Sequence, residues 1–274
     1  MSSLQESIRR IKPAIVQIVV SATLPEETRV RQAIVGTGFF VAEDQYVATA
    51  AHVFKATQEE LVKLGGKDIV FEVQTPLRDI TAEFHSRQGF LTMPFAIVEF
   101  ADEHDLVLLK TTRRMGKKGV RAVATIKVKG KTKKYEMTDV RTAAIHAGNV
   151  NVGEEVAVAG FPLQTPYLVA QSGIVSATPI IPVSGTPNEE EQVLVDIMVN
   201  PGNSGGPAFL AKNGKVIGVC RAHRTSSVRT ETLEQTPLRQ NAGIGLITPA
   251  KFLIQLLERH RVKWQSRYSL WPTG

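Results

Sequence analysis

The hydrophobic positions of the chain fall mostly in short segments that are rich in valine, isoleucine and phenylalanine and are separated by charged or turn-forming residues. Segments of this composition are typical of β-strands. In the first half they occupy residues 15–20, 33–42, 46–50, 69–73, 97–100 and 106–110, and in the second half residues 155–159, 168–175, 193–199, 208–210, 216–220 and 242–247. Many short strands with few helices predict an all-β protein, and two similar halves favour two β-barrels.

Two segments near the ends of the chain have the spacing of amphipathic helices. Apolar residues recur at helical intervals in residues 4–11, and Pro13 ends this pattern, which predicts a short N-terminal helix. A second helical pattern covers residues 250–261. It follows Thr248 and Pro249, and a threonine N-cap with proline at the first helical position favours a C-terminal helix.

Composition limits the class of protein and its compartment. A chain of 274 residues, 43% of them hydrophobic, suits a soluble globular protein with one large domain or two small ones. No apolar run approaches the roughly 18 residues that a membrane-spanning helix needs, and residues 1–20 lack the features of a signal peptide. Cys220 is the only cysteine, so no disulfide can form within the chain. We therefore expect a cytoplasmic protein that does not bind a membrane.

The net charge of +7 has a local source between the two halves. Residues 113–134 contain ten lysines and arginines and no acidic residue. Apolar residues alternate from 120 to 128, which predicts a strand or a hairpin with a basic outer face. This basic connector is either a solvated linker or a docking patch for an anionic partner. Tyr135 is the only aromatic residue beside it, so a stacking platform for single-stranded nucleic acid is not expected.

Three polar residues in apolar surroundings form a candidate catalytic set. Ser204 lies in a glycine-rich turn, Asn200-Pro-Gly-Asn-Ser-Gly-Gly-Pro207, and glycines allow a backbone to aim N–H groups at a developing oxyanion. His52 ends a strand of small residues, and Asp105 directly precedes an apolar strand. A serine hydroxyl becomes a nucleophile when an imidazole takes its proton and a carboxylate orients that imidazole. The order His, Asp, Ser is that of the chymotrypsin arrangement, and it differs from the subtilisin and α/β-hydrolase orders.

The sequence resembles the trypsin-like serine proteases of the chymotrypsin fold, and most of all their HtrA/Deg branch. The resemblance spans roughly residues 14 to 260 and is carried by Gly36-Thr-Gly-Phe-Phe-Val41, Ala48-Thr-Ala-Ala-His-Val53, Asp105-Leu-Val-Leu-Leu-Lys110, Val152-Gly-Glu-Glu-Val-Ala-Val-Ala-Gly160, Ser172-Gly-Ile-Val-Ser176, Asn200-Pro-Gly-Asn-Ser-Gly-Gly-Pro207, Val216-Ile-Gly-Val219 and Gly243-Ile-Gly-Leu-Ile-Thr-Pro249. It implies two six-stranded antiparallel β-barrels with short N-terminal and C-terminal helices, and an active site in the cleft between the barrels.

The resemblance also implies the role of each residue. His52 would act as general base and then as general acid, Asp105 would orient it, and Ser204 would be the nucleophile that forms an acyl-enzyme. Asp102 is a rival carboxylate, but the family motif places the aspartate immediately before the apolar strand. We therefore expect a serine endopeptidase that acts on polypeptides.

The same resemblance assigns the oxyanion hole to the Ser204 turn. The backbone N–H groups of Gly202 and Ser204 would form it, with Asn203 in the loop between them. The sequence shows no metal-ligand spacing, phosphate-binding loop or dinucleotide motif. We therefore expect neither a metal nor a cofactor.

Substrate preference is expected to depend on the S1 pocket. The resemblance places Met198, six residues before Ser204, at the base of this pocket, which would offer no acid to a basic P1 side chain. The pocket walls are expected to include Arg221, Ala222, His223 and Gly243. We expect an apolar P1 preference. The alternative is an acidic P1 side chain recognised by His223 or Arg221.

The domain organisation follows from these assignments. Residues 1–112 would form the first barrel with the histidine and aspartate, residues 113–148 the basic connector, residues 149–262 the second barrel with the serine and the final helix, and residues 263–274 a short tail. HtrA/Deg proteases usually carry PDZ domains, and we expect none here. A monomer or a homotrimer is compatible with the resemblance. A function of another class would be a catalytically silent scaffold that binds an anionic partner through the connector.

Overall fold

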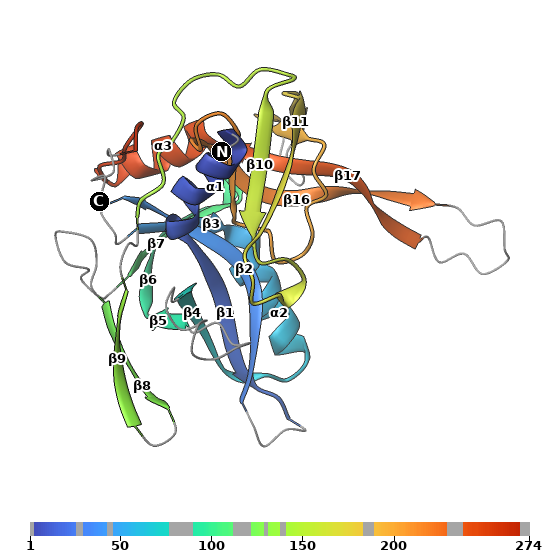
Figure 1. The fold of residues 1–274 in the computed structure, drawn as a ribbon. Helices are drawn as coiled ribbons and strands as arrows, with labels where there is room; N and C mark the ends of the chain where they lie inside the picture. Colours follow the sequence, from blue (N-terminus) through green and yellow to red (C-terminus); the bar gives the residue numbers. More distant parts are fainter. Residues whose placement is uncertain are drawn as a thin grey trace, which may run out of the picture.

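A computed structural model describes residues 3–25, 30–42, 46–76, 90–111, 122–128, 131–137, 141–182, 189–228 and 238–268. The protein is mostly β, as predicted, with two β-structures packed against each other and helices at their margins (Figure 1). No helix in the described ranges is long and apolar enough to cross a membrane.

The first half of the chain forms one curled antiparallel sheet of seven strands in the order β5-β4-β1-β2-β3-β7-β6. Its strands are β1 (Ile15–Thr23), β2 (Val30–Ala42), β3 (Tyr46–Ala50), β4 (Lys67–Pro76), β5 (Phe90–Met93), β6 (Phe95–Ala101) and β7 (Leu106–Thr111). The two edge strands, β5 and β6, are separated in sequence only by Pro94. Proline has no N–H to donate and interrupts a strand. The first half was expected to be a six-stranded barrel, and it is a curled seven-stranded sheet instead. Its two edge strands, β5 and β6, are joined through Pro94.

The second half forms a closed barrel of six strands in the order β10-β11-β14-β17-β16-β15, as the sequence predicts. Its strands are β10 (Glu155–Gly160), β11 (Val169–Ala177), β14 (Val193–Val195), β15 (Pro207–Leu210), β16 (Val216–Val228) and β17 (Leu238–Pro249). A short hairpin of β12 (Ile180–Pro182) and β13 (Glu189–Glu191) leaves the barrel between β11 and β14. The barrel interior is filled by aliphatic side chains, which agrees with the low aromatic content of the chain.

The two halves share a core because their facing strands are buried on both sides. In β2, Phe40 packs inside the first sheet, whereas Phe39 packs toward the second barrel. In β10, Val158 packs inside the second barrel, whereas Ala157 joins the shared core. Successive side chains of a strand point to opposite faces, so each of these strands contributes to two cores. This arrangement fixes the cleft between the halves.

In the described ranges three α-helices cover the margins of the sheets: α1 (Ser3–Ile11), α2 (Ala51–Lys63) and α3 (Ala250–Arg259). The predicted terminal helices, α1 and α3, are present, and both pack against the core that the two halves share. The expected cap of α3 is wrong, because Pro249 occupies the N-cap position and no side chain caps the helix. The Thr248 hydroxyl instead donates to the carbonyl of His104 at 3.1 Å, which links the second barrel to the first.

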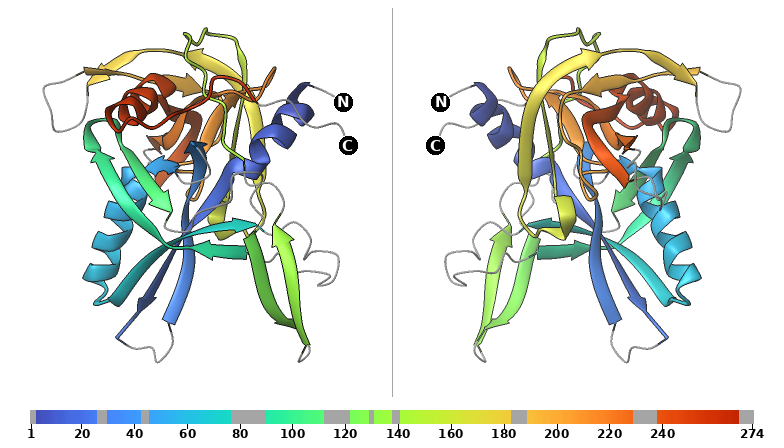
Figure 2. Two further views of the ribbon diagram at one scale, coloured as in Figure 1. Left: turned by 90° about the vertical axis from the view of Figure 1, so that its left-hand side faces the viewer. Right: turned by 90° about the vertical axis from the view of Figure 1, so that its right-hand side faces the viewer.

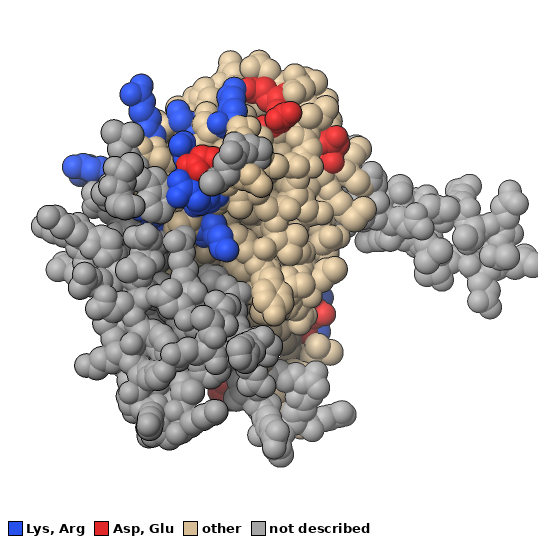
Figure 3. Space-filling model, in the orientation of Figure 1, with Lys and Arg blue, Asp and Glu red and all other residues tan. Residues whose placement is uncertain are grey.

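The basic connector contains the predicted hairpin, formed by β8 (Ala122–Val128) and β9 (Lys131–Met137). The hairpin extends from one end of the first sheet (Figure 2). Its side chains, and with them the expected basic outer face, lie outside the described residues. The described lysines and arginines also gather on the face that carries α1 and α3 (Figure 3), where Arg9 and Arg10 pair with Glu6.

Candidate active site

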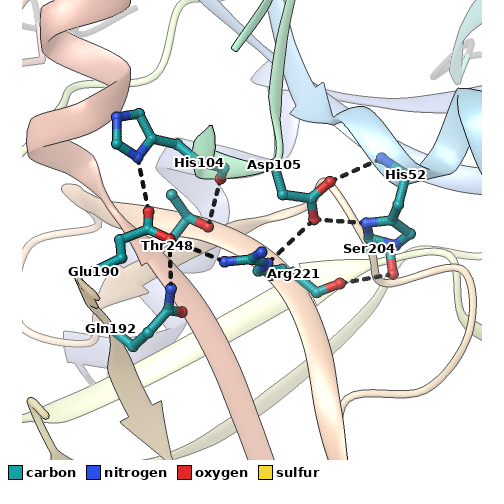
Figure 4. Close-up of polar contacts among 8 residues, drawn as sticks. All are labelled: His52, His104, Asp105, Glu190, Gln192, Ser204, Arg221 and Thr248. Carbon is teal, nitrogen blue, oxygen red and sulfur yellow. Dashed lines mark hydrogen bonds and ion pairs between the residues drawn. The ribbon is translucent and has the colours of Figure 1, made fainter. Parts of the chain in front are cut away.

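His52 stands in the first turn of α2, directly after β3. The first backbone N–H groups of a helix have no acceptor within the helix. The carboxylate of Asp105 supplies one, because its Oδ1 accepts the backbone N–H of His52 at 2.8 Å. Its Oδ2 lies 2.7 Å from Nδ1 of the same histidine (Figure 4). Asp105 therefore caps the helix and holds the imidazole ring at once, and a helix N-terminus favours the negative charge.

The backbone of Asp105 is fixed as tightly as its side chain. The residue has left-handed dihedral angles, φ 53° and ψ 39°, which aspartate tolerates better than most residues. Its carbonyl accepts the N–H of Ala51 at 3.1 Å. The rival carboxylate, Asp102, is 57% exposed and pairs with Lys55. The structure thus brings Asp105, rather than Asp102, to His52.

Ser204 lies in the turn between β14 and β15, which we call the Ser204 loop (residues 200–207). Its backbone carbonyl accepts the N–H of Thr37 at 2.9 Å, so the loop is tied to β2 of the first sheet. Its hydroxyl is half-buried and faces the carbonyl of Arg221, 3.5 Å away. In the view of Figure 4 the Ser204 side chain lies directly below the His52 ring. Among the described hydrogen bonds, none joins the Ser204 hydroxyl to the imidazole.

Two backbone N–H groups of the Ser204 loop are oriented by the carbonyls of their own peptide groups. The carbonyl of Pro201 accepts the N–H of Leu163 at 2.7 Å. Because a trans peptide directs its C=O and N–H to opposite sides, the N–H of Gly202 points away from Leu163. The carbonyl of Asn203 accepts the N–H of Gly206 at 2.9 Å. The N–H of Ser204, in the same peptide group as that carbonyl, therefore points away from Gly206. In the described part of the chain neither N–H has an acceptor.

Two positions of the loop require glycine. Gly202 has a left-handed φ of 96°, and a Cβ there would overlap the carbonyl oxygen of Phe161. Gly205 has a φ of 82°, and a Cβ there would overlap the hydroxyl of Thr49. Side chains are disfavoured at such angles even in open space. The glycines therefore let the loop approach the first sheet and the chain before β11 closely.

Asn203 occupies the loop between the two oriented N–H groups without joining them. Its own N–H donates to the carbonyl of Asn200 at 3.0 Å, so it is not available to an oxyanion. Its side chain is buried, and a Cβ on Gly160 would lie 2.8 Å from its Oδ1. The side chain thus packs under the loop and supports its shape.

Thr37 is a residue of the site to which the sequence reasoning assigned no role. Its side chain is fully buried between the two halves. Its Oγ1 donates to the carbonyl of Gly202 at 2.6 Å and accepts the N–H of Phe161 at 3.0 Å. A hydroxyl residue between two glycines in an apolar strand, at residues 36–38, is the sequence signal that could have indicated it.

The fold and the order of the three residues agree with a comparison of the sequence with known families. The profile of the trypsin-like peptidase domain matches residues 36–219, more than half of the chain. This chain belongs to the trypsin-like peptidase family. The resemblance predicted from its motifs is therefore confirmed, while the expected absence of a PDZ domain stays a prediction.

Several proteins similar to this trypsin-like domain are named as proteases. The chain is 27% identical over 79% of its length to the magnetosome formation protease MamE of Magnetospirillum gryphiswaldense, and covers 21% of that protein. It is 27% identical over 67% of its length to a probable periplasmic DegP-like serine endoprotease of Hahella chejuensis, and covers 29% of it. The structure of the HtrA-type protease AlgW with a decapeptide superimposes with a TM-score of 0.58 at 17% identity, over 94% of this chain and 67% of that one. The chain thus spans less than a third of these two curated relatives.

The expected cytoplasmic location of the protein is wrong by these comparisons. Two of the relatives are named as periplasmic endoproteases and one as a magnetosome protease, which points away from the cytoplasm. The physical reason for the error is that one cysteine excludes an internal disulfide but does not select a compartment. Proteins outside the cytoplasm fold without disulfides when their hydrophobic core is large enough.

Three of the residues that were expected to form the S1 pocket, Met198, Gly243 and Arg221, differ in their exposure and in the groups they face. Met198 is 48% exposed. Gly243 has a left-handed φ of 75°, and the space where a Cβ would stand is open. The guanidinium of Arg221 faces the carboxylates of Asp105 and Glu190 (Figure 4). The side chains of Ala222 and His223 lie outside the described residues.

Cys220 binds the Ser204 loop through its backbone, and its thiol has no reactive role. Its carbonyl accepts the N–H of Gly205 at 2.7 Å, and its N–H donates to the carbonyl of Gly206 at 2.8 Å. Burial raises the pKa of its thiol far above the ordinary value, so it is not a reactive thiolate. Within the described ranges no three His, Cys, Asp or Glu side chains are grouped to hold a metal ion.

Proposed function

We propose that this trypsin-like domain is a serine endopeptidase in which Ser204 is the nucleophile, His52 the general base and acid, and Asp105 the residue that orients the imidazole. The observation that supports this proposal most is the two-point attachment of Asp105 to His52, at 2.7 Å to the ring and 2.8 Å to the backbone. A carboxylate bound to Nδ1 keeps that nitrogen protonated and leaves Nε2 as the acceptor for a hydroxyl proton.

The reaction would begin with the transfer of the Ser204 hydroxyl proton to Nε2 of His52. The Ser204 Oγ, turned by a χ1 rotation from the Arg221 carbonyl to the imidazole, would attack the scissile carbonyl. The oriented N–H groups of Gly202 and Ser204 would receive the oxyanion. The imidazolium would then protonate the leaving amine, which gives the acyl-enzyme. A water molecule, deprotonated by the same imidazole, would attack the ester, and the imidazolium would return the proton to the leaving Ser204 oxygen.

The substrates of such an enzyme are polypeptides, and we propose a preference for apolar P1 residues. The half-exposed Met198 and the open space at Gly243 support an uncharged pocket. Arg221 gives no support to an acidic preference, because its guanidinium is already bound by Asp105 and Glu190. A cleavage profile on a peptide library is the direct test. We expect leucine, valine, alanine and methionine at P1, and dominant aspartate or glutamate would contradict the proposal.

The proposed activity is tested by hydrolysis of an unfolded protein substrate with purified full chain. We expect cleavage by the wild type and none by the Ser204→Ala and His52→Ala variants. Ser176→Ala is a matched control, because this serine is exposed on β11 of the same barrel, and it should cleave as the wild type does. Cleavage that survives in Ser204→Ala would show that another residue or a contaminant is responsible.

The names of the relatives support a protease that works outside the cytoplasm, on the protein substrates of that compartment. For the assembly of the chain, a monomer and a homotrimer are the two alternatives. Sedimentation of the purified chain would distinguish the monomer from the homotrimer.

A further inference from the structure

We propose that Arg221 and Glu190 are positioning residues that set the charge around the Asp105–His52 pair, with the Glu190 carboxylate balancing the Arg221 guanidinium. This inference rests on the proposed function in one respect, the role of His52 as a base. It assigns a role to two side chains that lie behind the reacting atoms.

The first observation is the place of Arg221. Its Nε lies 3.6 Å from Oδ2 of Asp105, the same oxygen that binds the His52 ring. Its Nη1 donates to Oε2 of Glu190 at 3.1 Å. The guanidinium therefore stands between two carboxylates, one from the residue directly before β7 and one from the β12–β13 hairpin of the second half (Figure 4). A planar guanidinium is suited to bridging two such groups.

The second observation is the burial of Glu190. Its side chain is only 3% exposed, and a buried carboxylate is strongly destabilising unless partners surround it. Both of its oxygens have them. Oε1 accepts from Nδ1 of His104 at 2.9 Å, and Oε2 accepts from Arg221 and from Nε2 of Gln192 at 3.1 Å.

The third observation is that Glu190 reaches Asp105 by a second route. His104 directly precedes Asp105 in the chain, and its ring is stacked on Phe252 of α3 with centroids 3.9 Å apart. Its carbonyl accepts the hydroxyl of Thr248 at 3.1 Å. The network thus fixes the backbone that carries the carboxylate as well as the charge beside it.

The charges of this network have opposite effects on the imidazole. The positive charge of Arg221 partly neutralises the carboxylate of Asp105 and so disfavours the imidazolium form of His52. The negative charge of Glu190 partly neutralises Arg221 and so favours the imidazolium form. The other described charged or titratable groups near the pair line the shallow pocket beside it, of about 550 Å³, or contact the network: Lys55, Glu59, Asp102, Glu103 and His104. Lys55 and Asp102 pair with each other, so their charges largely cancel.

The test is an NMR titration of the His52 ring in the full chain, with the signal assigned through a His52→Gln variant. In Arg221→Gln the titration of the ring signals should move to higher pH, and in Glu190→Gln it should move to lower pH. The double variant should return it close to the wild-type value. Shifts of the same sign, or no shift in either variant, would overturn the proposal.

A conservative variant separates charge balance from a purely structural role. Arg221→Lys keeps the positive charge and should restore the His52 titration that Arg221→Gln changes, even where folding stability is reduced. If Glu190→Gln does not fold, the pair Arg221→Lys and Arg221→Gln still decides, because equal titrations in the two would contradict the proposal. The acid limb of the pH profile of kcat/KM should move in parallel with the NMR values.

The failure of this inference can be told from the failure of the proposed function. Labelling of Ser204 by a fluorophosphonate in the wild type reports the nucleophile alone. If Ser204 is labelled but the His52 titration is the same in all variants, the proposed role of Arg221 and Glu190 is wrong and the proposed protease function stands. If the two variants shift the His52 titration in opposite directions but Ser204 is not labelled, the proposed charge balance stands and the proposed hydrolytic function is wrong.

Discussion

The hydroxyl of Thr37 donates to the carbonyl of Gly202 at 2.6 Å and so joins the first sheet to the Ser204 loop of the second barrel. The same hydroxyl accepts the N–H of Phe161 at 3.0 Å. Two buried backbone groups of one half therefore depend on a single side chain of the other half. The geometry of the loop is a property of both halves together.

Thr37→Val keeps the shape of this side chain and removes both hydrogen bonds. The unpaired buried groups should lower the free energy of unfolding by about 1–3 kcal/mol and loosen the loop, with a loss of kcat that exceeds the change in KM. Thr37→Ser keeps the hydroxyl and is the matched control. Urea denaturation and steady-state kinetics of both variants test this, and equal behaviour of valine and serine would contradict it.

Asp105→Asn should reduce kcat by about 10³- to 10⁴-fold, because an amide NH₂ facing Nδ1 favours the wrong imidazole tautomer. Asp102→Asn is the comparison, since Asp102 is exposed and pairs with Lys55. It should keep activity within a few-fold of the wild type. A large loss in Asp102→Asn with a small one in Asp105→Asn would reverse the assignment of the two carboxylates.

Gly202→Ala should abolish most of the activity while the protein still folds. The new Cβ would overlap the carbonyl of Phe161, and the loop must shift, which moves the Gly202 N–H away from the oxyanion. The loss of one such donor corresponds to about 10²- to 10³-fold in kcat. Gly153→Ala is a control at a comparable left-handed φ of 86° but in open space, and it should cost some stability and no activity.

Glu154 supports the turn before β10 through Lys212, whose ammonium lies 2.6 Å from its carboxylate, and through the N–H of Asn151. These bonds, that of Lys212 first, hold the pKa of Glu154 below its ordinary value of 4.5. A lowered pKa adds stability above the unfolded-state pKa, and this stability is lost as the pH falls through the folded value. Glu154→Gln should therefore be less stable at pH 7 by about 0.5–1 kcal/mol, because Lys212 is exposed and screened by solvent.

The difference between wild type and Glu154→Gln should shrink as the pH falls below about 4.5, the ordinary pKa of the side chain. Thermal denaturation of the two proteins at a series of pH values measures it. A difference that persists unchanged at the lowest pH would show that the carboxylate charge is not responsible.

The sequence predicts the strands and the order of the three polar residues because both are local patterns. Alternating apolar residues specify strands, and the chemistry of Ser204, His52 and Asp105 stands out against their surroundings. The break at Pro94 was missed, although proline in a strand is a local signal. Pro94 separates β5 from β6, and the apolar pattern predicted only residues 97–100 of this region as a strand.

Other features depend on contacts between distant segments, and no local pattern reveals them. Arg221 was expected in the S1 pocket because the family resemblance takes the pocket walls from the segment after Val219. Its side chain turns instead to Asp105 and to the buried Glu190, which the β12–β13 hairpin brings from elsewhere in the second half. The Thr248 hydroxyl was expected to cap α3, and the nearby carbonyl of His104 takes it instead.

The central claim is that Ser204 is an activated nucleophile in the folded protein, and labelling by a fluorophosphonate probe tests it most directly. The wild type should gain one adduct per chain, mapped by mass spectrometry to Ser204. His52→Ala and Ser204→Ala, and the wild type in denaturant, should gain none, because activation depends on the folded arrangement. An unlabelled folded wild type, or equal labelling in His52→Ala, would contradict the account.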